Sequence, residues 1–178
     1  MAAKTVAITI FALIAATVVG SVIYSLLPYS DPPKTVDHVD LSRYVGLWYE
    51  ISSIPFFFGE GCICSTANYT DNGDGTIRVE NSCDRNGERS VAIAKAWPAD
   101  STNSKLKVEF FWPIKADYWV VALDADYRWA VVSHPSREYL WILSRTSHLE
   151  EGLYDDILAN LKENKLPIEQ LVLTSANC

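Results

Sequence analysis

The segment Gly46-Leu47-Trp48-Tyr49-Glu50 and a distant arginine constrain the fold of this chain more than any other feature. The glycine permits a tight turn, and the tryptophan two residues later opens an extended stretch. Residues 139–144 read as a strand that ends at Arg145. If the sheet between the two segments closes on itself, the guanidinium can stack on the indole, a contact worth about 1–2 kcal/mol when desolvated. Such a contact would plug one end of a cup and leave the other end open.

Period-two patterns dominate the chain after Trp48. Short alternating segments separated by polar turns favour an antiparallel barrel or sandwich, and Asp71-Asn72-Gly73-Asp74-Gly75 is a strong hairpin signal. Eight strands close a barrel that is just wide enough for one small ligand. We therefore predict an all-β fold, an eight-stranded up-and-down antiparallel β-barrel. The predicted strands are 48–54, 65–70, 76–82, 91–97, 105–112, 118–124, 129–133 and 139–144.

One amphipathic helix is expected after the strands. Residues 149–161 carry Leu or Ile at every fourth position, while acidic residues occupy the opposite face near the N-terminal half. Pro167 lies beyond its end. We expect this helix to pack on the outside of the barrel and residues 171–173 to form a short additional strand.

The N-terminal segment is predicted to be a hydrophobic helix. No charged residue occurs between Lys4 and Asp31, and such a run is long enough to span a bilayer. A secretory signal peptide cleaved after Gly20-Ser21 is the alternative, but the apolar run continues to Leu27 and favours an uncleaved anchor whose Lys4 stays cytoplasmic. The predicted organisation is an anchor or signal peptide over 1–29, a tether over 30–39 and a folded domain over 40–178. The domain is then exported: it is membrane-anchored and faces the periplasm, lumen or exterior, or it is secreted after cleavage.

Cysteines and charge narrow the classes of function. Cys62, Cys64, Cys83 and Cys178 all lie in the exported part, so two disulfides are expected, with three connectivities open. No metal site is predicted, because Cys-x-Cys lacks the usual ligand spacing and the histidines are scattered. The net charge of −7 disfavours nucleic acid as a partner.

No set of catalytic residues is apparent. Adjacent Ser133 and His134 do not make a nucleophile–base pair, and His38 and His148 fall outside the strands. Glu50 is the only acid placed inside the cup, where it can accept hydrogen bonds at the closed end. We therefore predict a protein without a cofactor that is not an enzyme. An enzyme acting on a lipid or isoprenoid and an interaction module with a filled interior are the alternatives.

The chain resembles the lipocalin family, and within it the bacterial lipocalin and apolipoprotein D branch. The family's first motif is matched by residues 46–50, its second, usually Thr-Asp-Tyr, by Ala125-Asp126-Tyr127, and its third by Arg145 after the last strand. The resemblance implies transport or storage of lipids and other hydrophobic ligands at or near membranes. Many bacterial members carry a lipid-modified cysteine, but no cysteine precedes Cys62 here, so the N-terminal segment could replace that anchor.

The resemblance also implies a disulfide pairing. It joins Cys64 to Cys178 and leaves Cys62 with Cys83. If Ala67 faces Val79 across the first hairpin, however, Cys83 points to the other face unless a bulge intervenes.

Strand parity identifies the side chains that face the cup. Glu50, Ser52 and Ile54 share the face of Trp48. Tyr139, Trp141 and Leu143 share the face of Arg145, and the resemblance places Tyr118, Val120, Ala122, Ala130 and Val132 inside as well. The predicted barrel-closing residues are Gly46, Trp48, Glu50 and Arg145. The predicted ligand-binding residues are Tyr69, Val108, Phe110, Trp112, Tyr118, Val120, Tyr139 and Trp141.

Three adjacent phenylalanines, Phe56, Phe57 and Phe58, lie in the loop after the first strand, at the mouth of the cup. They can fold back as a lid or form a lip that touches a membrane or gates the ligand. The predicted partners are a hydrophobic small molecule or lipid, and a membrane contacted through the N-terminal segment and this loop.

Overall fold

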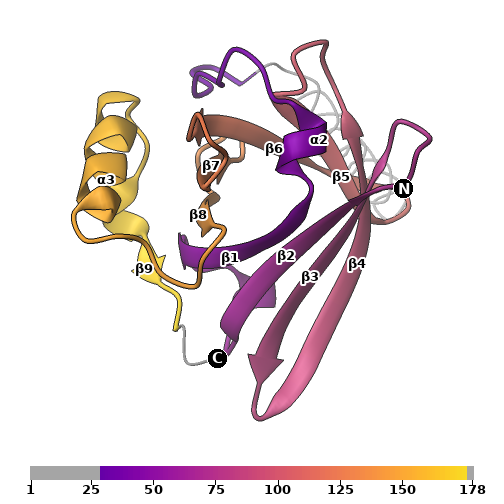
Figure 1. The fold of residues 1–178 in the computed structure, drawn as a ribbon, viewed down its shortest axis with the longest axis horizontal. Helices are drawn as coiled ribbons and strands as arrows, with labels where there is room; N and C mark the ends of the chain where they lie inside the picture. Colours follow the sequence, from indigo (N-terminus) through magenta and orange to yellow (C-terminus); the bar gives the residue numbers. More distant parts are fainter. Residues whose placement is uncertain (1–28, 176–178) are drawn as a thin grey trace, which may run out of the picture. The chain divides into compact units, whose positions relative to one another are not determined.

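The computed structural model describes residues 29–175, apart from the side chain of Phe58. Strands β1 to β8 form one antiparallel sheet in which each strand pairs with the next, and β1 pairs with both β2 and β8. The sheet thereby closes on itself, which confirms the predicted barrel (Figure 1). The strands are β1 (Gly46–Ser53), β2 (Ile63–Asp71), β3 (Ile77–Arg85), β4 (Glu88–Pro98), β5 (Lys105–Phe111), β6 (Ile114–Leu123), β7 (Trp129–Ser133) and β8 (Leu140–Ser144).

The connections alternate between two ends of the barrel. At the closed end, where β1 begins, a short helix that the sequence did not predict, α2 (Leu41–Tyr44), precedes the first strand (Figure 1). The Asp40 side chain caps it by accepting from the Ser42 N–H. The opposite end is the mouth, which carries the 3₁₀ turn η1 (Phe57–Gly59) and the hairpins β3–β4, β5–β6 and β7–β8.

Buried apolar side chains form two clusters, one on each side of the barrel wall. The inner cluster fills the closed half of the barrel and includes Tyr44, Trp48 and Val120. The outer cluster lies between the wall and α3 (Leu153–Glu163) and includes Leu140 and Ile142 of β8. The alternation of β8 between the clusters follows from the pleat, which sends successive side chains to opposite faces.

The predicted helix is present outside the barrel. It begins at Leu153, after Gly152 with a φ of 81°, so the Leu149 end of the predicted periodicity precedes the helix proper. Ile157 and Leu161 are 2 % and 0 % exposed and anchor the helix in the outer cluster. After it come η2 (Ile168–Gln170) and the expected additional strand, β9 (Val172–Leu173), which pairs with β1.

Two β-bulges change which residues face the cup. The register of β1 against β8 shifts between Glu50 and Ser52, so the prediction that Ser52 and Ile54 share the face of Trp48 is wrong. Ile54 belongs to the outer cluster, and Ser52 accepts a hydrogen bond from Tyr154 of α3. An extra residue reverses the period-two alternation beyond it.

The second bulge lies in β6, whose register against β7 shifts between Val120 and Ala122. Val120 stays in the inner cluster, whereas Ala122 joins the outer one. Ala122 was therefore wrongly expected inside, and Leu123 packs against the inner cluster instead.

Residues 33–39, within the predicted tether, lie against the barrel. The Val36 N–H donates to Val120, the Val39 N–H donates to Thr102, and the Val39 side chain is fully buried. Residues 1–28, predicted as the anchor or signal peptide, lie outside the described residues. Over 29–175, every helix is too short or too polar to traverse a bilayer.

The first hairpin holds a disulfide between Cys62 and Cys83. The register of β2 against β3 shifts after Ile63, where Cys64 has a φ of 53°. This bulge brings Cys62 and Cys83 to the same side of the hairpin, as the pairing required.

The assumed register of that hairpin is wrong by two residues, because Ala67 pairs with Asn81 and not with Val79. The predicted Cys64–Cys178 bridge stays a prediction, since Cys178 lies outside the described residues. None of the described cysteines is a free thiol.

Candidate functional site

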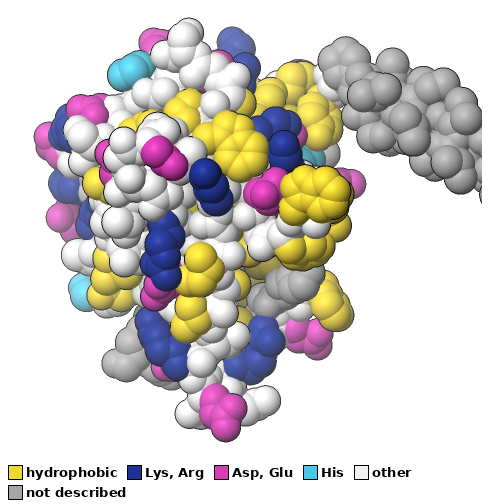
Figure 2. Space-filling model, turned by 90° about the vertical axis from the view of Figure 1, so that its right-hand side faces the viewer, with side chains coloured by type: hydrophobic (Ala, Val, Ile, Leu, Met, Phe, Trp, Pro, Cys, Tyr) yellow, Lys and Arg dark blue, Asp and Glu magenta, His cyan; other side chains and the backbone are white. Residues whose placement is uncertain are grey.

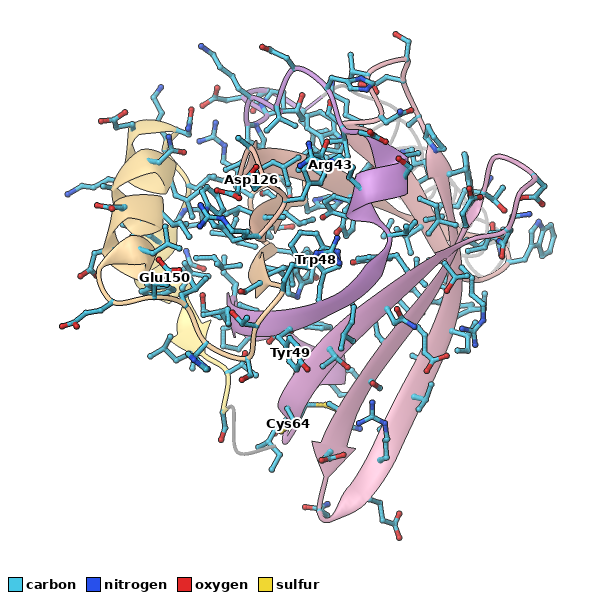
Figure 3. All side chains as sticks on the ribbon, viewed as in Figure 1. Arg43, Trp48, Tyr49, Cys64, Asp126 and Glu150 are labelled. Carbon is cyan, nitrogen blue, oxygen red and sulfur yellow. A yellow bond between two sulfur atoms is a disulfide. The ribbon has the colours of Figure 1, made fainter. Side chains whose placement is uncertain are left out.

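The closed end of the barrel is built around Trp48 and Arg145. The guanidinium carbon of Arg145 lies 3.7 Å from the centroid of the Trp48 ring. The indole is fully buried, and its Nε1–H donates to the Tyr44 carbonyl at 2.8 Å. Figure 3 shows Trp48 inside the barrel and Arg43 on α2. Trp48, near the start of the first strand, and Arg145, directly after the last one, thus close the barrel together.

The Arg145 guanidinium also fastens the chain that leads into β1. Desolvation lowers its pKa, but an arginine side chain remains charged in a protein. Its fixed fork of donors matches a ring of backbone carbonyls. The acceptors are the carbonyl oxygens of Arg43, Tyr44, Val45, Leu47 and Tyr127, at 2.8 to 3.3 Å.

Gly46 is required by this arrangement. Its φ is +97°, a conformation that side-chain-bearing residues rarely adopt. A Cβ atom at this position would lie 3.3 Å from Nη1 of Arg145. The glycine of the first motif therefore serves both the turn and the close approach of the arginine.

The second motif meets the first at the same end. Tyr127 accepts a hydrogen bond from the Asp40 N–H through its hydroxyl, and the Arg43 guanidinium lies 4.2 Å from the centroid of its ring. The Arg43 guanidinium also donates to the carbonyl oxygen of Ala125, the residue before Asp126, at 3.2 Å. Asp124 holds the turn, because its carboxylate accepts from the backbone N–H groups of Asp126 and Arg128. A side-chain hydrogen bond from Arg128 lowers the pKa of Asp124.

Three tyrosines cross the interior above Trp48. The Tyr118 hydroxyl lies 2.7 Å from that of Tyr44 and 3.0 Å from that of Tyr69. Burial raises the pKa of all three, that of Tyr69 to about 12, so they are neutral at physiological pH. Together they form a polar layer in an otherwise apolar interior.

The inner wall becomes more accessible from the floor to the mouth. Near the floor, Trp48, Val120 and Val132 are fully buried. Tyr69 and Val108 belong to the same inner cluster, and Tyr118 and Trp141 pack against it while remaining only partly buried. The structure thus brings together five of the predicted ligand-binding residues: Tyr69, Val108, Tyr118, Val120 and Trp141.

Aromatic side chains line the inner edge of the mouth. Tyr139 stacks on Trp141 with ring centroids 6.1 Å apart, and Phe56 meets both rings edge-on. Phe57 points the other way and is 82 % exposed. The two adjacent phenylalanines therefore differ, because Phe56 packs inward and Phe57 faces solvent.

Two predicted ligand-binding residues lie elsewhere. Trp112 was expected on the inner face of the fifth strand, and this is wrong: it lies beyond β5, at the tip of the β5–β6 hairpin, and is 82 % exposed. Pro113, which has no N–H for a ladder, follows it and ends the strand pairing. Phe110 adjoins a register shift in β5 and borders a hollow with Arg78 and Lys95, outside the inner cluster.

Glu50 has partners other than those expected. Its carboxylate accepts hydrogen bonds from the hydroxyls of Ser53 at 2.9 Å and Thr174 at 2.6 Å, whereas donors at the closed end were expected. The contact links β1 to the segment after β9. Glu50 therefore has a structural role at the junction of these strands.

Comparison with known proteins identifies the family. The family model described as Lipocalin-like domain matches residues 39–176. Temperature-induced lipocalin-1 of Arabidopsis thaliana is 40 % identical over 78 % of this chain and 80 % of its own length. The chain belongs to the lipocalin family. The outer membrane lipoprotein Blc of Citrobacter freundii is 36 % identical, over 79 % of this chain and 83 % of that protein.

Apolipoprotein D of Macaca fascicularis is 34 % identical to this lipocalin over 82 % of each chain. Insecticyanin from the tobacco hornworm Manduca sexta has the same fold, with a TM-score of 0.67 and 24 % identity, covering 84 % of this chain and 87 % of that one. The resemblance to the bacterial lipocalin and apolipoprotein D branch is therefore confirmed.

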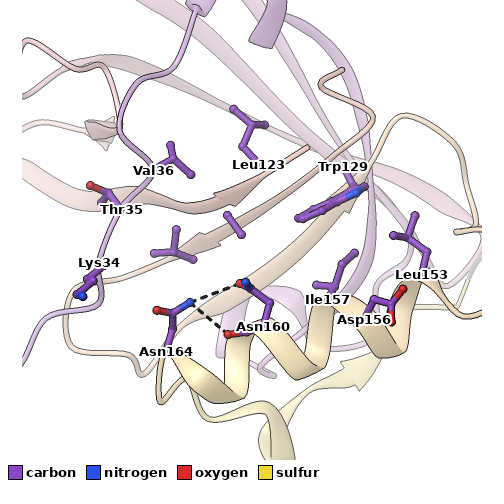
Figure 4. A pocket seen from close by; sticks show the side chains of 12 residues that line it. Lys34, Thr35, Val36, Leu123, Trp129, Leu153, Asp156, Ile157, Asn160 and Asn164 are labelled. Atoms are coloured by element: carbon purple, nitrogen blue, oxygen red, sulfur yellow. Dashed lines mark hydrogen bonds between the residues drawn. The ribbon is translucent and has the colours of Figure 1, made fainter. Parts of the chain in front are cut away.

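A second hollow of this lipocalin lies outside the barrel, between α3 and the wall (Figure 4). Its volume is about 440 Å³, and apolar side chains of Val36, Leu123 and Trp129 line it. At its rim, the Asn164 side chain donates to Asn160, one turn earlier on α3. No sequence pattern predicted this hollow, because it depends on how residues 34–36 pass over the strands.

The outer wall of the lipocalin carries mixed charge. In Figure 2, hydrophobic side chains lie in separate groups among basic and acidic ones. Ion pairs join neighbouring strands, as between Lys107 and Asp117 at 2.7 Å. Tyr44 is the principal site residue that sequence reasoning missed, and the capping Asp40 before it was the available signal for its helix.

Proposed function

We propose that this lipocalin binds one small hydrophobic ligand in its barrel, such as a fatty acid or lysophospholipid, and carries or stores it in support of membrane maintenance. The observation that carries the proposal is the accessible inner face of the mouth half. Ala116 pairs with Val108 of the inner cluster, and Ala92 lies two residues before Ala94 of that cluster, yet both are exposed. Small inward-facing residues leave volume for a ligand.

The proposed acyl chain runs past Tyr139 and Trp141 toward the tyrosine layer, with its head group at the mouth near Phe56. Each buried methylene contributes about 0.8 kcal/mol. About ten methylenes would give a gross ~8 kcal/mol, less the cost of ordering the chain and fixing the ligand. Affinity in the micromolar range is the expected result. The proposed lining residues are Tyr69, Val108, Tyr118, Val120, Tyr139 and Trp141.

The proposed location is outside the reducing cytoplasm, at a membrane. A disulfide between Cys62 and Cys83 supports export, because such bonds persist in oxidising compartments. One group of relatives carries the name outer membrane lipoprotein. We propose that residues 1–29 act as anchor or signal peptide, that 30–39 join them to the barrel, and that 40–178 form the lipocalin domain.

We propose a second membrane contact at the mouth, through four exposed apolar residues that we call the apolar rim. Phe57 comes from η1, and the other three form the β5–β6 tip. Their side chains are 59 to 82 % exposed, which is costly in water unless another surface covers them. The apolar rim consists of Phe57, Phe111, Trp112 and Ile114.

A binding role is favoured over catalysis because the acid inside the cup, Glu50, is engaged by Ser53 and Thr174. Titration of the full chain with fatty acids of increasing length, followed by tryptophan fluorescence, tests the carrier function. An amphipathic polymer keeps the chain in solution. Affinity should rise with chain length until the cup is full and then level off, and Trp141→Ala should weaken it without unfolding the domain. Absence of any response below the micelle threshold would reject the carrier in favour of a filled interior.

A further inference from the structure

Tyr69 and Tyr118 reach across the barrel from opposite walls. Tyr69 stands on β2 and Tyr118 on β6, halfway around the closed sheet of β1 to β8, and their hydroxyl oxygens lie 3.0 Å apart. Tyr44 rises from α2 at the closed end and meets the Tyr118 hydroxyl at 2.7 Å. The layer therefore bridges the lumen and forms a polar floor beneath the open half of the cup.

The floor has one hydrogen-bond donor more than it uses. Three tyrosine hydroxyls carry three O–H donors, and the two hydrogen bonds between them use two. Within residues 29–175, these hydroxyls have no other hydrogen-bond partner. One donor is therefore left over wherever the hydrogen atoms are placed, and an unused donor in an apolar interior costs free energy.

Tyr118 is best placed to offer that donor to the cup. Tyr44 and Tyr69 are 1 % and 7 % exposed, whereas Tyr118 is only partly buried. When Tyr44 and Tyr69 both donate to Tyr118, the Tyr118 proton is free to point toward the mouth. The raised pKa of each hydroxyl keeps the group a neutral donor at physiological pH.

We propose that the Tyr118 hydroxyl is a hydrogen-bonding subsite for an uncharged carbonyl oxygen at the buried end of the ligand. This inference rests on the proposed carrier function and names its ligand class: a long apolar molecule with a ketone, aldehyde or ester at its leading end. A carboxylate does not fit the floor, because one donor cannot replace the several hydrogen bonds that a buried charge requires. The nearby Arg145 guanidinium already donates to the backbone carbonyls of Arg43 and Leu47.

A matched pair of probes tests the subsite. Hexadecanoic acid and 15-oxohexadecanoic acid differ only by a ketone oxygen at the end that enters first. The test quantity is the ratio of their dissociation constants, measured by tryptophan fluorescence on the full chain in an amphipathic polymer. Tyr118→Phe should shift this ratio against the oxo acid by about 3- to 10-fold relative to the unmodified chain, the value of one net hydrogen bond.

Tyr154→Phe is the matched control. It removes a tyrosine hydroxyl that donates to Ser52 in the outer cluster, outside the cup, so the ratio should change by less than about twofold. If both acids bind but the ratio is the same in the unmodified chain and in Tyr118→Phe, the subsite is wrong and the carrier function stands. If neither acid binds, both proposals are overturned.

A second measurement needs no variant and decides the matter should Tyr118→Phe fail to fold. The ketone of the oxo acid is labelled with carbon-13, and its infrared band is recorded on the bound ligand. A band at lower frequency than in hexane is expected for a hydrogen-bonded carbonyl. A band at the hexane position would overturn the subsite.

Discussion

The guanidinium carbon of Arg145 lies 3.7 Å from the centroid of the Trp48 ring, so the end of the last barrel strand is locked onto the start of the first. Arg145→Ala removes the stacking partner and the donors to several backbone carbonyls at once. We expect a loss of roughly 2–4 kcal/mol in the free energy of unfolding, the range for core defects. Urea unfolding of the full chain in an amphipathic polymer measures it.

Lys115→Ala is the control for that loss. Its ammonium lies 5.2 Å from the centroid of Trp97 on the barrel wall, and it is exposed. Removing an exposed cation–π contact should cost less than about 1 kcal/mol. Equal losses in the Lys115 and Arg145 variants would contradict a special role for the closed end.

Gly46→Ala tests the close approach of the arginine to the backbone. The change places a Cβ atom 3.3 Å from Nη1 of Arg145 at a φ of +97°. Gly73→Ala is the matched control, because its φ is +73° but nothing lies within 4 Å of the added atom. Both variants should lose about 1–2 kcal/mol from backbone strain, and Gly46→Ala should lose more. Circular dichroism during urea unfolding gives both values, and a larger loss at Gly73 would reject the explanation.

The barrel and its closure could be predicted from the sequence. The strands follow from the local alternation of apolar and polar residues, and the closure follows from one pair of side chains, Trp48 and Arg145. Alternation from Trp48 through Arg145 defined the strands, and the Trp48–Arg145 pair defined how they close. Inward and outward assignments failed where a bulge added a residue, as at Ser52 and Ala122. A bulge leaves no mark in a period-two pattern when both faces of a strand are apolar or small.

The tyrosine layer escaped sequence reasoning for a different reason. Tyr69 and Tyr118 were recognised as inward-facing, but their hydroxyl contact joins opposite walls of the barrel. Strand parity gives the face of a residue and not its height or its partner across the lumen. Trp112 was misplaced because parity was extended past the end of β5.

The disulfides give a prediction on stability and pairing. Replacing Cys62 and Cys83 by serine opens a loop whose ends are 21 residues apart in sequence. A loop of this size corresponds to about 3 kcal/mol of stabilisation in the chain-entropy description. Urea unfolding measures the loss, and peptide mapping without reduction should find Cys64 linked to Cys178. A Cys62–Cys64 link in that map would overturn both pairings.

The buried tyrosines predict a loss of stability in alkali. The pKa of Tyr69 is raised from an ordinary value of 10 to about 12, and the pKa values of Tyr44 and Tyr118 are raised in the same direction. The folded state therefore binds more protons than the unfolded state between these values, so stability is fully present below pH 10 and falls as pH rises toward 12. Urea unfolding at stepped pH, with tyrosinate absorbance as a second readout, checks this.

Tyr69→Phe should reduce the slope of that alkaline decline, because one fewer buried hydroxyl resists ionisation. The phenylalanine ring keeps the shape of the tyrosine ring, so packing is preserved. A slope that is unchanged in Tyr69→Phe would assign the decline to other groups.

If the apolar rim contacts the membrane, the unmodified chain should take up ligand from vesicles faster than a variant that lacks the rim side chains. Trp112 and Phe57 are each 82 % exposed at the mouth, and burying one such side chain contributes about 1.5–3 kcal/mol. Replacing both by serine should slow transfer of a fluorescent fatty acid from vesicles to the full chain at least about fivefold. Affinity for the same fatty acid without vesicles should stay within about twofold, because neither side chain lies in the inner cluster.

Ile93→Ser is the control, since Ile93 is 45 % exposed on β4 and lies outside the rim. Equal transfer rates in the double variant and the unmodified chain would show that the mouth takes up its ligand without touching the membrane.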